Sequence, residues 1–178
     1  MRLKAAARWK DLRAALTTMP GGGIWLRCAL VYAIFLACAA PIGLWFGLLH
    51  PGMPHLRPAD MASGGVLLLV QPAFVEEVVF RGLLLPREAN SLSRGRVVFM
   101  AGVALALYVA SHPVNAALFR PQLLRLFASP VYLTLTTLLG LTCTAAYFIS
   151  RSIWPPVAIH WLTVVTWIWF LGGQALLC

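Results

Sequence analysis

The stretch FVEEVVFRG, residues 74–82, holds three charged side chains inside an otherwise apolar run. A charge at mid-bilayer costs roughly 2.5–3.5 kcal/mol, so three facing lipid would cost on the order of 8–10 kcal/mol. They are therefore expected to face a protein interior or a wet cavity. Glu77 and Arg81 are four residues apart on one helix face and can pair. Glu76 points about 140° away from Arg81, so it keeps a carboxylate that can serve as a general base.

Two histidines lie in apolar segments and are candidates for the same site. His112 ends the stretch LALYVASH, directly before Pro113, which is expected to break or kink its helix. His160 lies five residues into the last apolar run. Two imidazoles and the Glu76 carboxylate around one water can activate that water or bind zinc. The alternative is that each histidine satisfies an interhelical hydrogen bond.

The elements that must carry these side chains are membrane helices. Of the 178 residues, 61% are hydrophobic and 11% are charged, whereas a soluble domain carries about 25% charged residues. A spanning helix needs about 20 apolar residues. The sequence predicts an all-α polytopic membrane bundle of about five to six transmembrane helices. His50 and His55 flank a proline-rich loop and are expected to be solvated. The apolar segments are 28–49, 63–85, 97–110 with an extension to 119, 131–149 and 155–176.

The first 27 residues form a basic leader, and residues 28–178 are expected to fold as a single transmembrane domain. The leader predicts either an interfacial amphipathic helix or a frayed basic segment. With the N-terminus in the cytoplasm, ten lysines and arginines lie on the inner side and three on the outer side, which the positive-inside rule favours. The inner set is Arg2, Lys4, Arg8, Lys10, Arg13, Arg27, Arg87, Arg94, Arg96 and Arg151; the outer set is Arg57, Arg120 and Arg125.

The net charge of +9 does not indicate nucleic acid as a partner. The basic residues cluster in the leader and in short connectors, which is the pattern of a membrane topology signal rather than of a DNA-binding surface.

The four cysteines form no C-x-x-C pair and are expected to be small packing residues.

Three motifs occur in order along the chain: EEVVFRG at 76–82, YVASH at 108–112 and IHWLTVV at 159–165. They resemble those of the CPBP intramembrane proteases, the CAAX-protease and bacteriocin-processing (Abi-type) family. That family's pattern is E-E-x-x-x-R, F-x-x-x-H and H-x-x-x-N or a similar small polar residue. The resemblance covers roughly residues 70–170, which it implies to be the catalytic core, with a catalytic cavity inside the bundle. None of it falls in the first 60 residues.

The resemblance implies a role for each matching residue. In such proteases the first glutamate and the first histidine hold the water that attacks the scissile carbonyl, which here are Glu76 and His112. The second histidine, His160, helps to stabilise the oxyanion. Glu77 and Arg81 are implied to be structural support, in agreement with their spacing on a helix.

Two positions depart from the family pattern. Tyr108 stands where the pattern has phenylalanine, which adds a hydroxyl group. Val164 stands four residues after His160, where the pattern has a polar side chain. Thr163 is the adjacent polar residue, but it lies about 100° round the helix. Losing one oxyanion donor lowers the rate about 10²–10³-fold. Three alternatives follow: another group donates to the oxyanion, His160 is sufficient as the donor, or the protein is a weak or inactive enzyme.

The function expected from these residues is that of an intramembrane endopeptidase acting on a membrane-associated protein or peptide. The protein is expected to be multi-pass in a bacterial inner membrane, with no cofactor; the alternative is zinc held by Glu76, His112 and His160. A competing hypothesis is a catalytically weak or inactive membrane binding or immunity protein, in which the Glu-Arg residues are structural and which Val164 favours. A weaker one is a transporter or haem protein that uses the two histidines as ligands.

Overall fold

The protein contains helices and no strand within the residues that the computed structural model describes, 2–53, 56–88 and 92–177. The helices are α1 (Arg2–Thr17), α2 (Gly22–Trp45), α3 (Pro58–Leu68), α4 (Val75–Glu77), α5 (Arg94–Phe119), α6 (Leu124–Phe127), α7 (Pro130–Ser150), α8 (Trp154–Phe170) and α9 (Gly173–Leu177). Wider helical turns, Leu69–Phe74 and Val78–Leu83, flank α4, and a tighter turn, Pro121–Leu123, precedes α6. His50 is exposed, and His55 lies outside the described residues.

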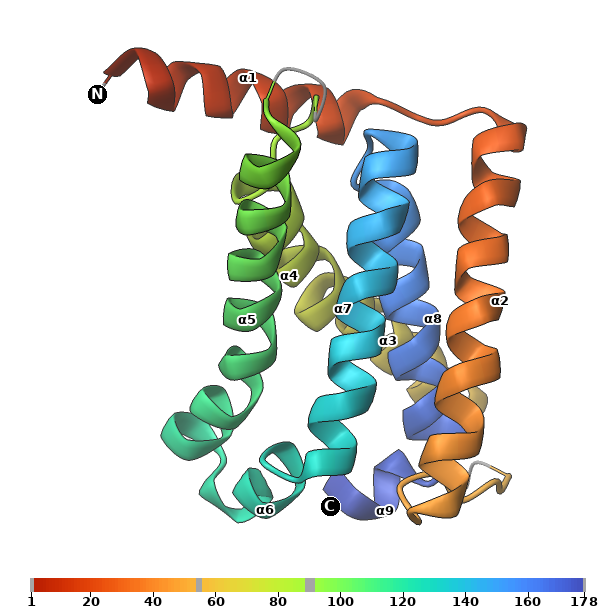
Figure 1. The fold of residues 1–178 in the computed structure, drawn as a ribbon. Helices are drawn as coiled ribbons and strands as arrows, with labels where there is room; N and C mark the ends of the chain where they lie inside the picture. The colour runs from red at the N-terminus through yellow and green to blue at the C-terminus, as the bar shows by residue number, and fades with distance from the viewer. Residues whose placement is uncertain (1, 54–55, 89–91, 178) are drawn as a thin grey trace.

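The long helices form a bundle with α1 laid across one end. Figure 1 shows α2, α5, α7 and α8 running away from α1, with α6 and α9 at the opposite end. Helix α7 packs against α2, α5 and α8, so it lies at the centre of the bundle. One buried cluster, around Tyr147 and Ile153, lies near α1, and a second, around Phe35 and Cys143, lies between α2 and α7.

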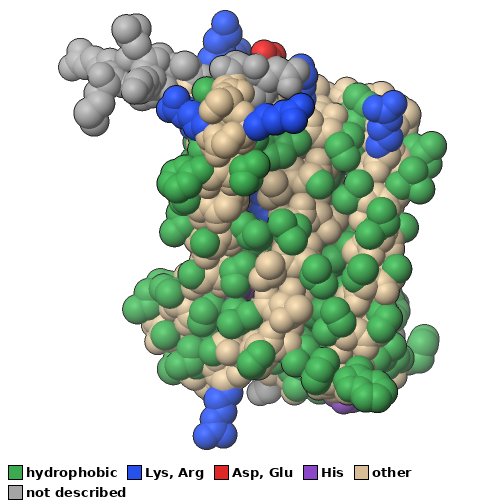
Figure 2. Space-filling view, in the orientation of Figure 1, with side chains coloured by type: hydrophobic (Ala, Val, Ile, Leu, Met, Phe, Trp, Pro, Cys, Tyr) green, Lys and Arg blue, Asp and Glu red, His purple; other side chains and the backbone are tan. Residues whose placement is uncertain are grey.

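The outer surface of the bundle is apolar. Leu26, Leu30 and Ile34 follow one another at four-residue spacing along α2 and are 63%, 58% and 65% exposed. Figure 2 shows apolar side chains over the flank in view and lysine and arginine towards the two ends. In the described part of the chain, three helices are long and apolar enough to cross a membrane: α2, α5 and α7. Such a flank suits lipid rather than water, which confirms the prediction of an all-α integral membrane bundle.

The second predicted span, 63–85, is wrong as one continuous helix. Gln71 has φ −131° and ψ 114°, in the extended region, so the helical path is interrupted between α3 and α4. Pro72 is the reason, because the residue before a proline avoids the helical region to escape a clash with the proline ring. The helical segment that carries Glu76 and Glu77 therefore starts anew after the break.

The first and last predicted spans also end earlier than expected. Helix α2 ends at Trp45 and α8 ends at Phe170. Each end is followed by a glycine with positive φ, 69° at Gly47 and 81° at Gly172. This left-handed conformation suits glycine, which has no Cβ, and it terminates a helix. The apolar run continues past Gly172, which is why composition alone extended the span.

Of the two outcomes expected from Pro113, a break or a kink of the helix, the break does not occur. Helix α5 runs through Pro113 to Phe119, so the extension of that span is present. Membrane helices tolerate an internal proline, although the missing N–H of Pro113 leaves the carbonyl four residues earlier, that of Val109, without its helical donor. Ser111 Oγ donates to the Tyr108 carbonyl at 2.7 Å, and His112 Nδ1 lies 2.9 Å from the same oxygen.

Helix α1 is joined to the bundle through carbonyl oxygens near its C-terminal end. The Ile153 N–H donates to the Ala15 carbonyl at 3.2 Å, and Trp154 Nε1 donates to the Leu16 carbonyl at 2.9 Å. The last four carbonyls of a helix have no partner inside it, so they are available to such donors. These hydrogen bonds position the start of α8 against α1. That α1 lies at a lipid interface is still a prediction.

Candidate active site

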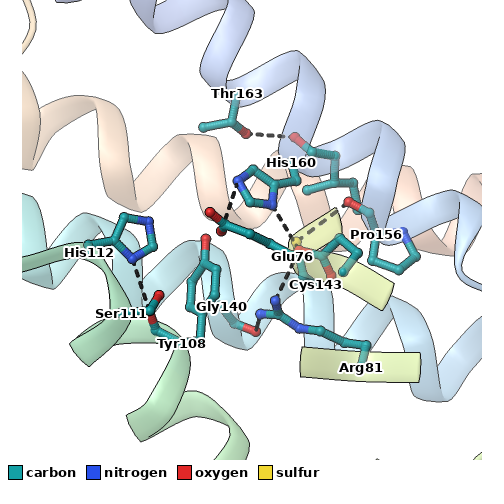
Figure 3. A network of polar contacts seen from close by, with 12 residues as sticks. Glu76, Arg81, Tyr108, Ser111, His112, Gly140, Cys143, Pro156, His160 and Thr163 are labelled. Atoms are coloured by element: carbon teal, nitrogen blue, oxygen red, sulfur yellow. Dashed lines mark hydrogen bonds and ion pairs between the residues drawn. The ribbon is translucent and has the colours of Figure 1, made fainter. Parts of the chain in front are cut away.

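The candidate site lies inside the bundle, where segments distant in the sequence converge. Figure 3 shows side chains from α4 and the turn after it, from α5 and from α8 meeting around one point, with the backbone of α7 beside them. The residues concerned are Glu76, Arg81, Tyr108, His112, Gly140 and His160. They include all three sequence-predicted catalytic residues, and the buried Glu77 joins them through its contacts with Arg81 and His160.

Glu77 binds two partners through one carboxylate oxygen. Arg81 Nη1 donates to Glu77 Oε1 at 3.0 Å, and His160 Nδ1 lies 2.9 Å from the same oxygen. Arg81 Nη2 donates to the Gly140 carbonyl of α7 at 2.9 Å. The Glu77 and Arg81 side chains are 0% and 2% exposed. Because a carboxylate accepts hydrogen bonds, His160 Nδ1 carries a proton and its Nε2 is directed away from Glu77.

Glu76 faces different surroundings from its neighbour. Its side chain is 16% exposed, and its Oε2 lies 3.9 Å from His160 Nε2, beyond hydrogen-bond range. That oxygen is buried, yet it has no hydrogen-bond partner within the described residues. Adjacent helix positions point about 100° apart, which is how Glu77 enters the ion pair while Glu76 faces a cavity.

His112 is oriented by its own helix. Its Nδ1 lies 2.9 Å from the Tyr108 carbonyl oxygen, an acceptor, so Nδ1 carries the proton. Nε2 is then the nitrogen that can accept a proton or hold a water molecule. The His112 ring packs against Tyr132 of α7, with 5.8 Å between the ring centroids, and lines the cavity that Glu76 faces.

A cavity of about 610 Å³ connects these side chains. Glu76, Tyr108, His112 and His160 lie in its wall. From them it extends between α2, α5, α7 and α8 to the end of the bundle that holds α6 and α9. The wall is mostly apolar with a few convergent polar groups, which is the usual composition of a site that binds a small ligand or a short chain segment.

Tyr108 stands between the two histidines of the site. Its ring centroid lies 5.0 Å from that of His112 and 6.0 Å from that of His160. The Arg81 guanidinium carbon lies 4.4 Å from the centre of the Tyr108 ring, a cation–π contact. Tyr108 is 1% exposed, so the ring is a fixed part of the site.

A family model described as type II CAAX prenyl endopeptidase Rce1-like matches residues 58–166, which is more than half of the chain. The chain belongs to this family. No curated protein and no solved structure matches it. The matched range contains Glu76, Tyr108, His112 and His160, whereas α1 and α2 lie outside it.

Membership of the Rce1-like family confirms the resemblance drawn from the three motifs. It supports a CAAX-type protease embedded in a membrane, in agreement with the apolar flank of the bundle. The roles of individual residues are not part of that match, and they depend on the geometry around the cavity.

The departure at Val164 is visible in the structure. Val164 lines the cavity and offers no hydrogen-bond donor where the family pattern has a polar side chain. The hydroxyl of Thr163 donates to the Ile159 carbonyl at 2.8 Å, so its single proton is used on its own helix. Trp161 Nε1 donates to the Gly65 carbonyl at 2.8 Å and is likewise engaged. Thr163 and Trp161 therefore do not replace it. Thr166 and Trp167 also lie in the cavity wall, and Trp167 Nε1 is buried without a hydrogen-bond partner among the described residues.

Several polar residues of the cavity wall are missing from the sequence prediction, among them Asn115 and Tyr132. Asn115 lies three residues after His112 on α5, and Tyr132 lies near the start of α7. The i,i+3 spacing from His112 was a signal for Asn115, because such positions share a helix face. Tyr132 had no signal of this kind, since it reaches the site only through the packing of α7 against α5.

The zinc alternative has Glu76, His112 and His160 as its ligands. Within the described residues, no three histidine, cysteine, aspartate or glutamate side chains lie close enough together to hold a metal ion. His112 and His160 each direct Nδ1 to another protein group, which leaves Nε2 as the ring nitrogen free to bind a metal or a water. His160 Nε2 lies 3.9 Å from Glu76 Oε2.

Substituting Gly140 by alanine is expected to lower the free energy of unfolding by about 1–3 kcal/mol, because the close packing around α7 leaves no room for a methyl group. A Cβ at Gly140 would lie 3.0 Å from Tyr108 Cδ1 and closer to Leu105, so the Tyr108 ring would have to shift. Thermal unfolding in detergent, followed by circular dichroism, measures the change.

Gly102→Ala is the matched control for this substitution. Gly102 lies on α5, and a Cβ added there meets nothing within 4 Å. Its replacement is expected to keep or raise the stability, because alanine favours the helix more than glycine does. Equal melting temperatures for the two alanine variants would contradict the tight packing assigned to Gly140.

Proposed function

We propose that the protein is an intramembrane endopeptidase that hydrolyses a peptide bond with a water molecule activated by Glu76 and His112. The observation that carries the proposal is the different use of two adjacent glutamates. Glu77 is engaged by Arg81 and His160 through its Oε1, while the Glu76 carboxylate lies in the cavity wall. Each glutamate also has a buried Oε2 without a hydrogen-bond partner among the described residues, so the position of Glu76 in the cavity wall is what sets it apart. A carboxylate held in place and free to take a proton is what a general base requires.

In the proposed reaction, the water oxygen attacks the scissile carbonyl carbon while Glu76 takes a proton from the water. His112 Nε2 accepts a hydrogen bond from the same water and orients it. The carbonyl π electrons move onto its oxygen, which becomes an oxyanion and needs hydrogen-bond donors. His160, oriented by Glu77 through Nδ1, directs Nε2 away from Glu77, and this nitrogen is the one that would donate to the oxyanion. When the C–N bond breaks, Glu76 returns the proton to the leaving amine.

The proposed substrate is a membrane-associated protein or peptide, and the partner surface is the lipid bilayer. We also propose a bacterial inner membrane as the location, with the α1 end in the cytoplasm, because basic side chains collect at that end. In this orientation, the cavity extends from the site towards the outer face. The basic side chains described at the α1 end are Arg8, Lys10, Arg13, Arg27, Arg87, Arg94, Arg96 and Arg151.

The test of this function is cleavage of a membrane-tethered peptide library by the purified full chain in detergent, with products identified by mass spectrometry. The wild type is expected to cleave at least one peptide, and His112→Ala to cleave it roughly 10²-fold more slowly. His50→Ala is the matched control, because His50 is exposed and lies outside the cavity wall. If His112→Ala cleaves the peptide at the wild-type rate, then Glu76 and His112 do not together activate the water.

A chelator arm in the same assay tests the zinc alternative. Because the mechanism uses side chains alone, the rate is expected to stay the same after treatment with a chelator and after zinc is added back. Loss of cleavage with the chelator and recovery with zinc would instead establish metal-dependent hydrolysis.

Val164 favours a second candidate, a membrane binding or immunity protein that keeps the fold without efficient catalysis. In that case Glu76, Glu77 and Arg81 would serve to hold helices together. The assay separates the candidates: a wild type that cleaves no peptide, combined with loss of folding in Glu76→Gln, supports the structural role. Cleavage by the wild type together with a folded, inactive Glu76→Gln variant supports the peptidase.

A further inference from the structure

The Tyr108 hydroxyl is a buried polar group that the proposed water-activating pair does not use. Within the described residues no group forms a hydrogen bond with it, although its residue is 1% exposed. Buried hydroxyl groups are nearly always hydrogen-bonded, because leaving one unpaired costs free energy. A buried hydroxyl without a protein partner in a cavity wall can therefore bind a group that enters the cavity, either water or the substrate.

The hydroxyl lies where the reaction would take place. Figure 3 shows the Tyr108 ring upright between His112 and His160, with its oxygen directed towards the Glu76 carboxylate. Tyr108, Glu76, His112 and His160 all line the same cavity. A carbonyl group that is attacked by water held at Glu76 and His112 would therefore have this hydroxyl beside it.

The ring is held rigidly, as a catalytic donor must be. The Arg81 guanidinium carbon lies 4.4 Å from the centre of the Tyr108 ring on one side, and Phe80 packs against it edge to face at 5.4 Å between centroids. The glycine at position 140 lets α7 approach the ring closely, since a Cβ there would lie 3.0 Å from Tyr108 Cδ1. Fixed donors need no reorganisation as charge develops, which is the basis of oxyanion stabilisation.

The position one helical turn after His160 supplies no hydrogen-bond donor to the site. The residue one helical turn after His160 is Val164, which cannot donate, and the Thr163 hydroxyl donates to the Ile159 carbonyl at 2.8 Å. A tyrosine hydroxyl carries its proton at neutral pH and can donate one hydrogen bond. It can thus supply the contact that the valine lacks.

We propose that Tyr108 is a catalytic residue whose hydroxyl donates a hydrogen bond to the oxyanion formed during peptide hydrolysis. This inference rests on the proposed endopeptidase function. The tyrosine forms no covalent bond and keeps its proton throughout. The new bond is the one between water oxygen and carbonyl carbon, Glu76 takes and returns the proton, and the C–N bond breaks as the carbonyl reforms.

The test compares the wild type with Tyr108→Phe, a change that removes one oxygen atom. The expected result is a kcat about 10²–10³-fold lower with KM little changed, because the hydrogen bond forms only to the charged intermediate. The thermal stability is expected to stay the same or rise, since the lost hydroxyl has no protein partner among the described residues. Tyr147→Phe is the matched control: its hydroxyl is also buried and unpartnered there, but it lies outside the cavity wall.

Two further variants test the assignment. Val164→Asn in the Tyr108→Phe background is expected to recover at least tenfold in kcat, because an amide donor enters the cavity wall one turn after His160. Asn115→Ala tests the rival donor in the same wall: a large loss of kcat there, combined with a wild-type kcat for Tyr108→Phe, overturns the inference.

The failure of the inference and the failure of the function give different results. One result would contradict only the role of Tyr108: the wild type cleaves the peptide, Glu76→Gln does not, and the kcat of Tyr108→Phe equals that of Tyr147→Phe. The proposed endopeptidase function would then still hold. If the wild type cleaves no peptide, the proposed function fails and the role of Tyr108 fails with it.

Discussion

Replacing Glu76 by glutamine is expected to lower cleavage by about 10⁴-fold and to leave the fold intact. Glutamine keeps the shape of the side chain but cannot take a proton from water. The buried Oε2 has no hydrogen-bond partner among the described residues, and His160 Nε2 lies 3.9 Å away, so the substitution removes no hydrogen bond of that oxygen. Measuring kcat and thermal unfolding on the same preparation separates the chemistry from the stability.

Asp60→Asn is the control for this change. Asp60 is a carboxylate on α3 outside the cavity wall, paired with Arg57 at 2.8 Å and 44% exposed. Its neutralisation is expected to leave the rate at the wild-type level. A Glu76→Gln variant that retains most of the wild-type rate would show that Glu76 is not the base.

Replacing Glu77 by glutamine is expected to destabilise the fold by about 3–5 kcal/mol, because it leaves the Arg81 charge buried without its partner. The two side chains are 0% and 2% exposed, and Arg81 Nη1 lies 3.0 Å from Glu77 Oε1. Such a loss is a large share of the roughly 5–15 kcal/mol that keeps a protein folded. Thermal unfolding and size-exclusion chromatography in detergent measure it.

Two controls identify the buried ion pair as the cause. Arg57→Ala removes an exposed partner, 84% exposed, and is expected to change the stability very little because water screens the charge. The double variant Glu77→Leu with Arg81→Met replaces the pair by apolar groups, so it is expected to be more stable than Glu77→Gln. The double variant is nevertheless expected to cleave no peptide, because His160 loses the acceptor that orients its Nδ1. A double variant no more stable than Glu77→Gln would contradict the buried-charge explanation.

The sequence alone accounts for the local geometry of the glutamate pair. Helix periodicity placed Glu77 on the face of Arg81 and turned Glu76 away, and the structure shows a 3.0 Å ion pair and a separate carboxylate in the cavity wall. The apolar composition likewise predicted the membrane bundle. Pro72 could have predicted the break in the helix at Gln71, but the long apolar run around these two residues favoured a single helix.

The contacts between helices were not accessible from the sequence. The Gly140 carbonyl accepts a hydrogen bond from Arg81, and His160 meets Glu77, only because α7 and α8 pack against the segment around α4. Likewise, Tyr108 could be noted as a departure from phenylalanine, but the direction of its hydroxyl depends on how α5 lies in the bundle. Spacing fixes neighbours along one helix, whereas tertiary packing decides which helix faces them.

The hydrogen bonds between α1 and the start of α8 bear on the design of shortened versions of this protein. The family match begins at residue 58, yet the segment leading to His160 is held by acceptors at Ala15 and Leu16. A truncated chain containing only residues 58–166 would lack these acceptors and also the α2 surface against which α7 packs. The stretch shared with relatives is therefore shorter than the unit that has to fold together, and a minimal active version must include α1 and α2.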